Sequence, residues 1–239
     1  MHYLSGNLAY DGSRFHGLAP VAKNRSVSSA FSQVLGCFGL EKLIFAGRTD
    51  KGVHALSMPF RAQSEHEFKD LAKLKELINA KLPEDLLLRD LRASHEGFNP
   101  RFDARYRVYR YLLSAKEQSL PNAYYIARCK VFDMKKANEL LSHFVGLHDF
   151  RAFSLKSEVK NSERHMNKAY CYAYKELFVL HFEASGFLRG QIRLIISLLL
   201  KVLEGKLEES AILKQLHDKA WYSRTLAPAS GLYLVRVKY

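Results

Sequence analysis

The residues with the clearest chemical potential form a short glycine-flanked segment around Asp50. The run GRTDKG, residues 47–52, stands between two apolar stretches that we expect to be strands. Glycines on both sides let the main chain and a ligand approach closely, and a carboxylate in such a loop is well placed to act as a nucleophile or a base. Arg48 could pair with Asp50 and keep it ionised. On residue types alone, an Asp-based turn with an incidental arginine explains the segment equally well.

A second cluster interleaves arginines with aromatic residues over residues 101–111. Guanidinium groups suit phosphates and aromatic rings suit unstacked bases, so an RNA-binding cleft would require this combination. Because side chains alternate between the faces of a strand, only part of the set can line one cleft, and some members must pack in the core. The cluster comprises Arg101, Arg105, Arg107 and Arg110 with Phe102, Tyr106, Tyr109 and Tyr111.

The charge balance indicates a polyanionic partner. Among 239 residues, 37 Lys and Arg face 24 Asp and Glu, which gives a formal net charge of +13 at pH 7. Such an excess costs self-repulsion in the folded state and usually accompanies binding to nucleic acid or to an anionic membrane. A generally basic proteome gives the same balance, so composition alone does not decide the partner.

Cysteine and histidine spacing predicts neither a disulfide framework nor a metal site. The three cysteines form no CxxC pair, and the ten histidines show no HxH or HExxH spacing. The N-terminal residues lack the basic start and apolar run of a signal peptide. The longest apolar stretch, residues 194–200, is too short to cross a bilayer. We therefore expect a soluble cytoplasmic protein without a metal.

The elements that must position the Asp50 loop lie in residues 1–104. The sequence pattern there predicts the order β-α-β-β-α-β. Apolar spacing supports this order, with Ser26 as a helix N-cap and Pro83 as a helix end. The expected elements are a strand at 2–11, a helix from 27 to about 38, strands at 42–47 and 53–62, a helix from about 68 to 82 and a strand at 86–91.

The pattern of residues 105–239 predicts a second half with a similar order of strands and helices. Asp133 is expected to be a further helix N-cap. Two α+β halves, with sheets side by side and the active cleft between them, are the simplest arrangement. The expected elements are a strand at 105–113, a helix after Asp133, a hairpin at 169–184 that turns near Lys175, helices at about 187–203 and 209–217, and a strand at 232–237.

Residues 155–168 connect elements of the second half and are polar without periodicity. They carry Lys156, Lys160, Arg164 and Lys168. We expect a solvated surface loop, and the alternative is a mobile basic arm that closes on a phosphate backbone.

Six segments resemble the tRNA pseudouridine synthase A (TruA) family, in that family's order. GRTDKGVHA, at residues 47–55, is similar to the family's GRTDAGVHA. The other five are YDGSRFHG at 10–17, FNPRFDARYRVYRY at 98–111, HDFRAFS at 148–154, GFLRGQIR at 186–193 and GLYLVRVKY at 231–239. Because chance would rarely produce six ordered matches over nearly the whole chain, the chain is identified as a member of that family.

The resemblance implies a pseudouridine synthase fold that isomerises uridine in the anticodon stem-loop of tRNAs, around positions thirty-eight to forty, as a homodimer. Uracil is detached at N1, rotated and rejoined through C5 to the same ribose C1′, so the reaction requires no cofactor. Asp50 matches the catalytic aspartate, which can act covalently on the sugar or remove the 2′ proton. Tyr109 matches the active-site tyrosine, and Arg193 matches the basic residue that pairs with the carboxylate.

Six further residues are candidates for binding the RNA substrate. Arg189 lies four residues before Arg193 on the expected helix, so the two would share a face. His54 could contact RNA or support Asp50, although a hydrogen-bonded core position explains it equally well. The six candidates are Arg48, Lys51, His54, Arg107, Arg110 and Arg189.

Two departures from the family pattern concern substrate contacts. Lys51 replaces the usual small residue after the catalytic aspartate and adds a cation there. Residues 17–20, GLAP, stand where the family has GWQ, so the chain departs from the family there in a region expected to contact the substrate.

Two other functions share the same charge and element order. A non-catalytic RNA-binding module is one, and a synthase that acts on another RNA position is the other. The intact set of Asp50, Tyr109 and Arg193 favours an enzyme. A membrane-surface protein is less compatible, because no expected helix joins a basic face to an aromatic insertion face.

Overall fold

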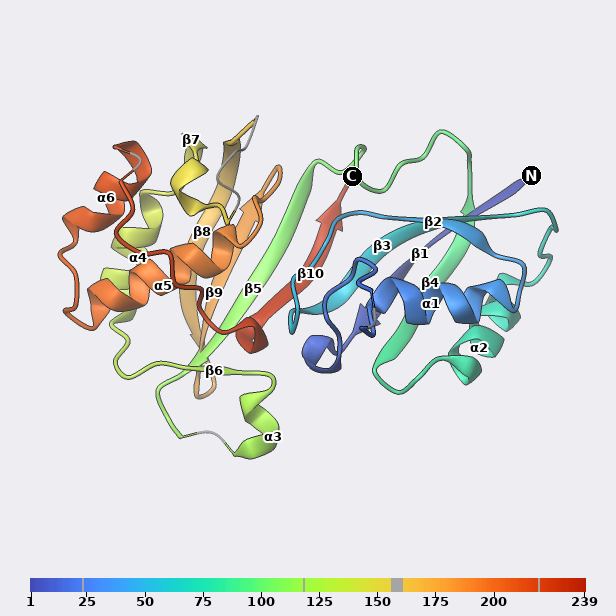
Figure 1. Ribbon diagram of the computed structural model, residues 1–239, viewed down its shortest axis with the longest axis horizontal. Coiled ribbons are helices and arrows are strands. Elements are labelled where there is room, and N and C mark those ends of the chain that lie inside the picture. Colours follow the sequence, from blue (N-terminus) through green and yellow to red (C-terminus); the bar gives the residue numbers. More distant parts are fainter. Residues whose placement is uncertain (23, 118, 156–160, 219) are drawn as a thin grey trace. The chain divides into compact units, whose positions relative to one another are not determined.

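The computed structural model describes residues 1–22, 24–117, 119–155, 161–218 and 220–239 (Figure 1). The chain forms two compact units, one of Met1–Arg105 with Tyr233–Tyr239 and the other of Tyr106–Leu232. The last seven residues thus group with the first unit, whereas the sequence analysis kept them in a C-terminal half of residues 105–239.

The first unit is built on strands in the order β4-β1-β3-β10, with β2 also paired to β3. Its strands are antiparallel except for β10, which runs parallel to β3 and places Tyr233 opposite His54. On α1, the buried Phe31 ring lies edge-to-face against Phe60 of β3, with 5.0 Å between centroids. The elements are β1 (His2–Tyr10), η1 (Gly12–Arg14), α1 (Val27–Gly36), β2 (Glu41–Phe45), β3 (His54–Ser64), α2 (Leu71–Lys81), β4 (Leu86–Ser94) and β10 (Leu232–Lys238).

The predicted order of the first unit is confirmed, and so is its first helix start. Ser26 caps α1 by accepting a hydrogen bond from the main-chain N of Ser29. The second helix begins at Leu71 rather than near residue 68, because the Asp70 side chain accepts a hydrogen bond from the Lys73 main-chain N and fixes the N-cap there.

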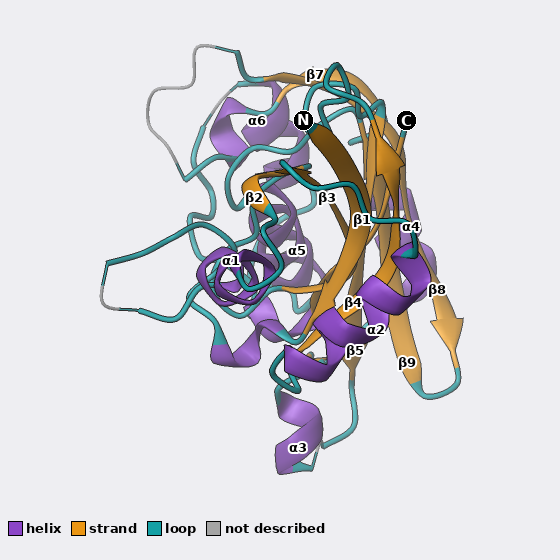
Figure 2. Ribbon diagram, turned by 90° about the vertical axis from the view of Figure 1, so that its right-hand side faces the viewer, coloured by secondary structure: helices purple, strands orange, loops and turns teal. Residues whose placement is uncertain are grey.

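The second unit is built on antiparallel strands in the order β5-β9-β8-β7, with β6 parallel to β5. The long helix α5 is buried along most of its length and lies beside this sheet (Figure 2). The elements are β5 (Tyr106–Ser114), α3 (Leu120–Ala123), β6 (Ala127–Arg128), α4 (Met134–Ser142), β7 (Gly146–Asp149), η2 (Arg151–Phe153), β8 (Glu163–Tyr174), β9 (Leu177–Ala184), α5 (Gln191–Leu203), α6 (Ser210–His217) and η3 (Ala229–Gly231).

Two predictions for the second unit were wrong. The long helix starts at Gln191 rather than near residue 187, because Gly190 takes a left-handed conformation with φ of 76° immediately before it. Residues 163–168 belong to β8 rather than to a loop. An irregular register between Met166 and Lys168 hides the strand period in the sequence. Lys156 and Lys160, the other part of the expected loop, lie outside the described residues.

The predicted α+β class is confirmed by these mixed elements. Over the described ranges, the helices are too short or too polar for any to cross a membrane. In the same ranges, His, Cys, Asp and Glu side chains do not gather in threes as metal ligands would.

Candidate active site

The Asp50 loop joins β2 to β3 and is fastened to the segment that follows β1. Leu18 donates its main-chain N–H to the Thr49 carbonyl at 3.2 Å, and Gly52 donates to the Phe15 carbonyl at 3.4 Å. These bonds flank Asp50 on both sides and fix the path of the main chain through it. The residue lies in a loop between two strands, as the sequence indicated.

Two glycines of the YDGSRFHG segment allow this close approach. A Cβ on Gly17 would lie 2.7 Å from the Thr49 carbonyl oxygen, and the φ of Gly17 is 94°. A Cβ on Gly12 would lie 2.0 Å from the Val53 carbonyl oxygen. Any larger residue at either position must displace the main chain that carries Asp50. The sequence gives no sign of these contacts with the Asp50 loop, because the partners of both glycines are distant along the chain.

Buried side chains complete the support of the loop. The Tyr10 hydroxyl and Thr49 Oγ1 share a buried hydrogen bond of 2.8 Å. The main-chain N–H of Gly12 donates to Nδ1 of His54 at 3.1 Å. The His54 ring stacks on Tyr233, with 4.6 Å between centroids, and only 2% of the residue is exposed. The structure therefore places His54 in the core, where it positions the turn that holds the loop.

The surface of the loop is cationic. Asp50 is half-buried, whereas Arg48 and Lys51 on either side of it are exposed. Two exposed cations beside a carboxylate raise the local concentration of a polyanionic substrate.

In the second unit, Tyr109 lies half-buried near the middle of β5. Its ring is edge-to-face with Phe187, with 5.2 Å between centroids and an interplanar angle of 83°. Arg107 shares the face of Tyr109 because they are alternate residues of a regular strand, with Val108 between them, whereas Arg110 points to the other face. Arg107 also donates from Nη1 to the Ser185 carbonyl at 2.6 Å. Arg107 and Tyr109 therefore border the same segment, residues 185–189.

Arg193 lies in the first turn of α5 and is tied to the loop before η3. Its Nε donates to the Ala227 carbonyl at 2.7 Å, and the Ala227 N–H donates to the Arg193 carbonyl at 3.1 Å. The adjacent Pro228 carbonyl accepts from the buried Tyr111 hydroxyl at 2.8 Å. Burial raises the pKa of Tyr111, an effect that the nearby Arg193 charge opposes. Arg193 is thus held to Ala227 by one side-chain and one main-chain hydrogen bond, and the residue is half-buried.

The sequence predicted that Arg189 and Arg193 share a helical face, and this prediction is wrong. Arg189 precedes the left-handed Gly190, lies outside α5 and is exposed. Its carbonyl accepts from the main-chain N of Leu155 at 3.0 Å. The left-handed turn separates the two arginines.

Arg164 borders the segment 185–189 as well, whereas the sequence placed it in a surface loop or, as the alternative, in a basic arm that closes on a phosphate backbone. Its Nε lies 3.3 Å from the position of a Cβ on Gly186. Nη1 donates to uncharged oxygens, including the Glu163 carbonyl at 2.6 Å and the Asn161 side-chain oxygen at 3.3 Å. Burial lowers the pKa of this guanidinium. The partner segment lies about twenty residues further along the chain, so only the fold could reveal this position.

The candidate residues thus divide between the two units. The first unit holds Asp50 with Arg48, Lys51 and the buried His54, and the second holds Tyr109 and Arg193 with Arg107, Arg110 and Arg189.

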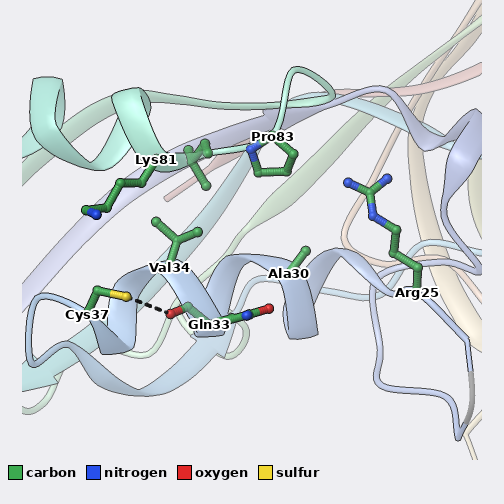
Figure 3. A pocket seen from close by; sticks show the side chains of 8 residues that line it. Arg25, Ala30, Gln33, Val34, Cys37, Lys81 and Pro83 are labelled. Carbon is green, nitrogen blue, oxygen red and sulfur yellow. Dashed lines mark hydrogen bonds between the residues drawn. The ribbon is translucent and has the colours of Figure 1, made fainter.

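A separate groove of about 510 Å³ lies between α1 and the end of α2 in the first unit (Figure 3). Its walls combine apolar side chains with Arg25 and Lys81, and the Arg25 guanidinium forms a two-pronged ion pair with Asp85. The predicted catalytic residues do not line it. The lining residues are Arg25, Ala30, Gln33, Val34, Cys37, Lys81, Leu82 and Pro83.

Three known proteins with similar sequences are named as tRNA pseudouridine synthases. The chain is 39% identical over 233 residues to a tRNA pseudouridine synthase A of Campylobacter jejuni, which covers 97% of each chain. It is 38% identical to tRNA pseudouridine synthase A of Wolinella succinogenes, over 97% of this chain and 92% of that one. A Bacillus cereus protein named tRNA pseudouridine synthase A 2 is 30% identical over the full length of both chains.

A family model and solved structures give weaker matches. The model described as tRNA pseudouridine synthase matches residues 140–239. A chain of a Cbf5-Nop10-Gar1 complex is 14% identical with a TM-score of 0.38, over 82% of this chain and 44% of that one.

Proposed function

The chain belongs to the tRNA pseudouridine synthase A family, and we propose that it isomerises uridine to pseudouridine in the anticodon stem-loop of tRNA, around positions thirty-eight to forty. The similarity to the relatives runs over nearly the whole chain, so it includes both the Asp50 loop and the Tyr109–Arg193 region. This full-length similarity is the observation that carries the proposal. The formal charge of +13 suits an RNA substrate.

In the proposed reaction, Asp50 acts on the ribose of the target uridine. The bond between N1 and C1′ breaks, uracil rotates, and C5 bonds to C1′. The C5 proton is lost and N1 regains one, so atoms and electrons balance without an oxidant or a donor group. Asp50 either attacks C1′ and is released when C5 bonds there, or removes the 2′ proton and returns it to C2′ after that bond forms. The fixed main chain on both sides of Asp50 limits the reorganisation that either step needs.

Tyr109 is proposed to receive the uracil that leaves the RNA stack. Its ring already packs edge-to-face on Phe187, so its orientation is set before substrate binds. A preset aromatic ring offers a stacking surface to the detached base, and its hydroxyl can assist removal of the C5 proton.

The arginines are proposed to bind the RNA around the target uridine. Arg193 and Arg107 are both anchored to main-chain carbonyls, and the planar guanidinium group suits contacts with phosphates. Arg48, Lys51, Arg110 and Arg189 are exposed and suit looser contacts with phosphates. His54 is proposed to position the Asp50 loop from the core instead of touching RNA.

The experiment that tests the function is site-specific pseudouridine mapping on unmodified tRNA transcripts, with wild type beside Asp50→Asn. This substitution keeps the shape of the side chain and removes its charge and basicity. We expect wild type to modify uridines of the anticodon stem-loop, and the variant to bind tRNA without reacting. If wild type binds tRNA but modifies no transcript, the protein is an RNA-binding module. If it modifies uridines elsewhere, the positional part of the proposal is wrong.

A second experiment separates the two roles open to Asp50. Deuterium at C2′ of the target uridine should slow a single turnover if Asp50 removes that proton in a rate-limiting step. A normal rate, together with an RNA–protein adduct trapped in denaturant, would indicate attack on C1′.

We also propose that the protein is cytoplasmic and acts as a homodimer, as the resemblance to the family implies. Analytical ultracentrifugation should give twice the mass of one chain for the free protein, and that mass plus the mass of the bound tRNA for the complex. A single-chain mass at the concentrations used for activity would contradict the dimer.

A further inference from the structure

The loop between α6 and η3 exposes a cluster of aromatic and cationic side chains. Trp221 is the single tryptophan of the chain, and 41% of it is exposed. The Arg224 guanidinium lies over its ring, 4.2 Å from the centroid. Tyr222, the next residue, is 39% exposed. We call Trp221, Tyr222 and Arg224 the aromatic platform.

Buried polar contacts hold the main chain beneath this platform. The fully buried Gln215 of α6 accepts from the main-chain N of both Tyr222 and Ser223 at 3.0 Å. Its side-chain nitrogen donates to the Ala152 carbonyl at 3.0 Å. Lys201 of α5 donates to the Ser223 hydroxyl at 2.9 Å. The segment has no regular structure of its own, yet two helices fix its path past α5 (Figure 1).

The same loop leads directly to the anchor of Arg193. Ala227 lies three residues after Arg224. It accepts a hydrogen bond from the Arg193 side chain and donates one to the Arg193 carbonyl. The platform is therefore joined, through a short constrained segment, to a residue proposed to act on the target uridine.

We propose that the aromatic platform binds unpaired nucleotides of the tRNA substrate, with a base stacked on Trp221 or Tyr222 and a phosphate at Arg224. This inference rests on the proposed function, because it takes tRNA as the ligand. Single-stranded RNA is bound by aromatic rings that stack on bases and by cations that follow the phosphates, and the platform supplies both. A rigid main chain lowers the entropy lost on binding. The high positive charge of the chain favours RNA over a basic or neutral protein as occupant.

Intrinsic fluorescence tests the platform directly, because Trp221 is the single tryptophan. A tRNA transcript is titrated into wild-type protein while binding is followed independently by filter retention. We expect quenching of the tryptophan emission that saturates with the same dissociation constant as filter binding. Unchanged emission at saturating tRNA would overturn the proposal. So would an emission change that depends on protein dilution alone, since it would place a second protein copy on the platform.

Variants measure how much the platform contributes. Trp221→Ala and Arg224→Gln should each weaken tRNA binding about tenfold, and Trp221→Phe should retain most of the affinity. Arg224→Gln should also reduce the salt dependence of binding by about one phosphate contact. A single-turnover rate at saturating tRNA should stay within about twofold of wild type, because the platform does not touch the reacting atoms.

A matched control exists on the same unit. Tyr174 is 58% exposed, and the Lys175 ammonium lies 5.7 Å from its ring centroid. Tyr174→Ala should leave tRNA affinity unchanged. Equal losses for Tyr174→Ala and Trp221→Ala would show a general surface effect and overturn the platform. Wild-type binding with no pseudouridine formed would instead contradict the proposed function, and the quenching result would still decide the platform.

Discussion

The two units fix their candidate catalytic residues by different physical means. In the first unit, main chain packs on main chain, and Gly12 and Gly17 leave room where a Cβ would come within 2.7 Å of a carbonyl oxygen. In the second unit, polar side chains such as Gln215 and Arg193 hold an irregular loop by hydrogen bonds to its main chain. Steric fit tolerates no added atom, whereas a hydrogen-bonded loop can lose one bond and keep the others.

This difference sets an expected hierarchy of mutational effects. Substitutions of the glycines that pack against the Asp50 loop should alter the position of Asp50 itself. Substitutions that remove one hydrogen bond of the loop between α6 and η3 should reduce the stability of the protein and its RNA affinity, because the remaining bonds still hold Arg193.

The largest effect is expected for the chemical group that the first unit holds. Asp50→Asn should lower the single-turnover rate at least about 10³-fold and leave tRNA affinity within about threefold. Rapid-quench assays with radiolabelled transcripts measure both. Glu67→Gln, an exposed carboxylate of the same unit, is the matched control and should behave as wild type. A rate for Asp50→Asn within tenfold of wild type would remove Asp50 from the chemistry.

The second largest effect is expected for the glycines that pack directly against the main chain of the Asp50 loop. Gly12→Ala and Gly17→Ala should each destabilise the protein by about 2–4 kcal/mol and lower the reaction rate, because the Asp50 loop must shift. Urea denaturation gives the stability change. Gly36→Ala is the control, since a Cβ there meets nothing within 4 Å. Similar small changes at all three positions would show that the loop adapts freely.

A smaller effect is expected where a buried side chain holds the second loop. Gln215→Leu leaves the main-chain N–H groups of Tyr222 and Ser223 without their acceptor and should cost about 2 kcal/mol. We also expect weaker tRNA binding, because the platform loses its support. Lys214→Ala, one residue earlier on the exposed side of α6, serves as control in the same denaturation and binding assays. Unchanged tRNA affinity in a folded Gln215→Leu variant would show that RNA binding by the platform does not depend on the hydrogen bonds from Gln215.

The smallest change concerns Tyr111 and depends on pH. Because burial raises the pKa of Tyr111, the unfolded chain releases this proton first as pH rises above about 10. Stability is therefore retained below pH 10 and falls above it, by up to about 1.4 kcal/mol per pH unit from this group. Tyr111→Phe should cost about 1 kcal/mol at pH 7, through loss of the bond to Pro228, and should show a shallower alkaline decline. Parallel alkaline declines in the two proteins would assign the effect to other groups.

Much of the local structure could be predicted from residue order. Ser26 and Asp133 begin helices as expected, because a side-chain oxygen that caps a main-chain N–H is a local interaction. The loop position of Asp50 and the strand position of Tyr109 were also evident from the spacing of apolar residues around them. Their catalytic roles remain predictions that the experiments above test.

Other features required the tertiary structure. The partners of Gly12 and Gly17 lie more than thirty residues along the chain, so their spacing in sequence carries no sign of the contact. The start of α5 depends on a left-handed Gly190 packed against Leu155, which places Arg189 outside the helix. A glycine at that position is equally compatible with a helix that continues through it, so the pattern alone gave the wrong boundary.

The sequence by itself determined the family and the α+β class and named the candidate catalytic residues, because these depend on residue types and short spacings. Only the tertiary structure decided that His54 is buried, that the last strand joins the first unit and that Gln215 holds the aromatic platform. Each of these depends on long-range packing, in which a side chain finds its partner through the fold and not through its neighbours in sequence.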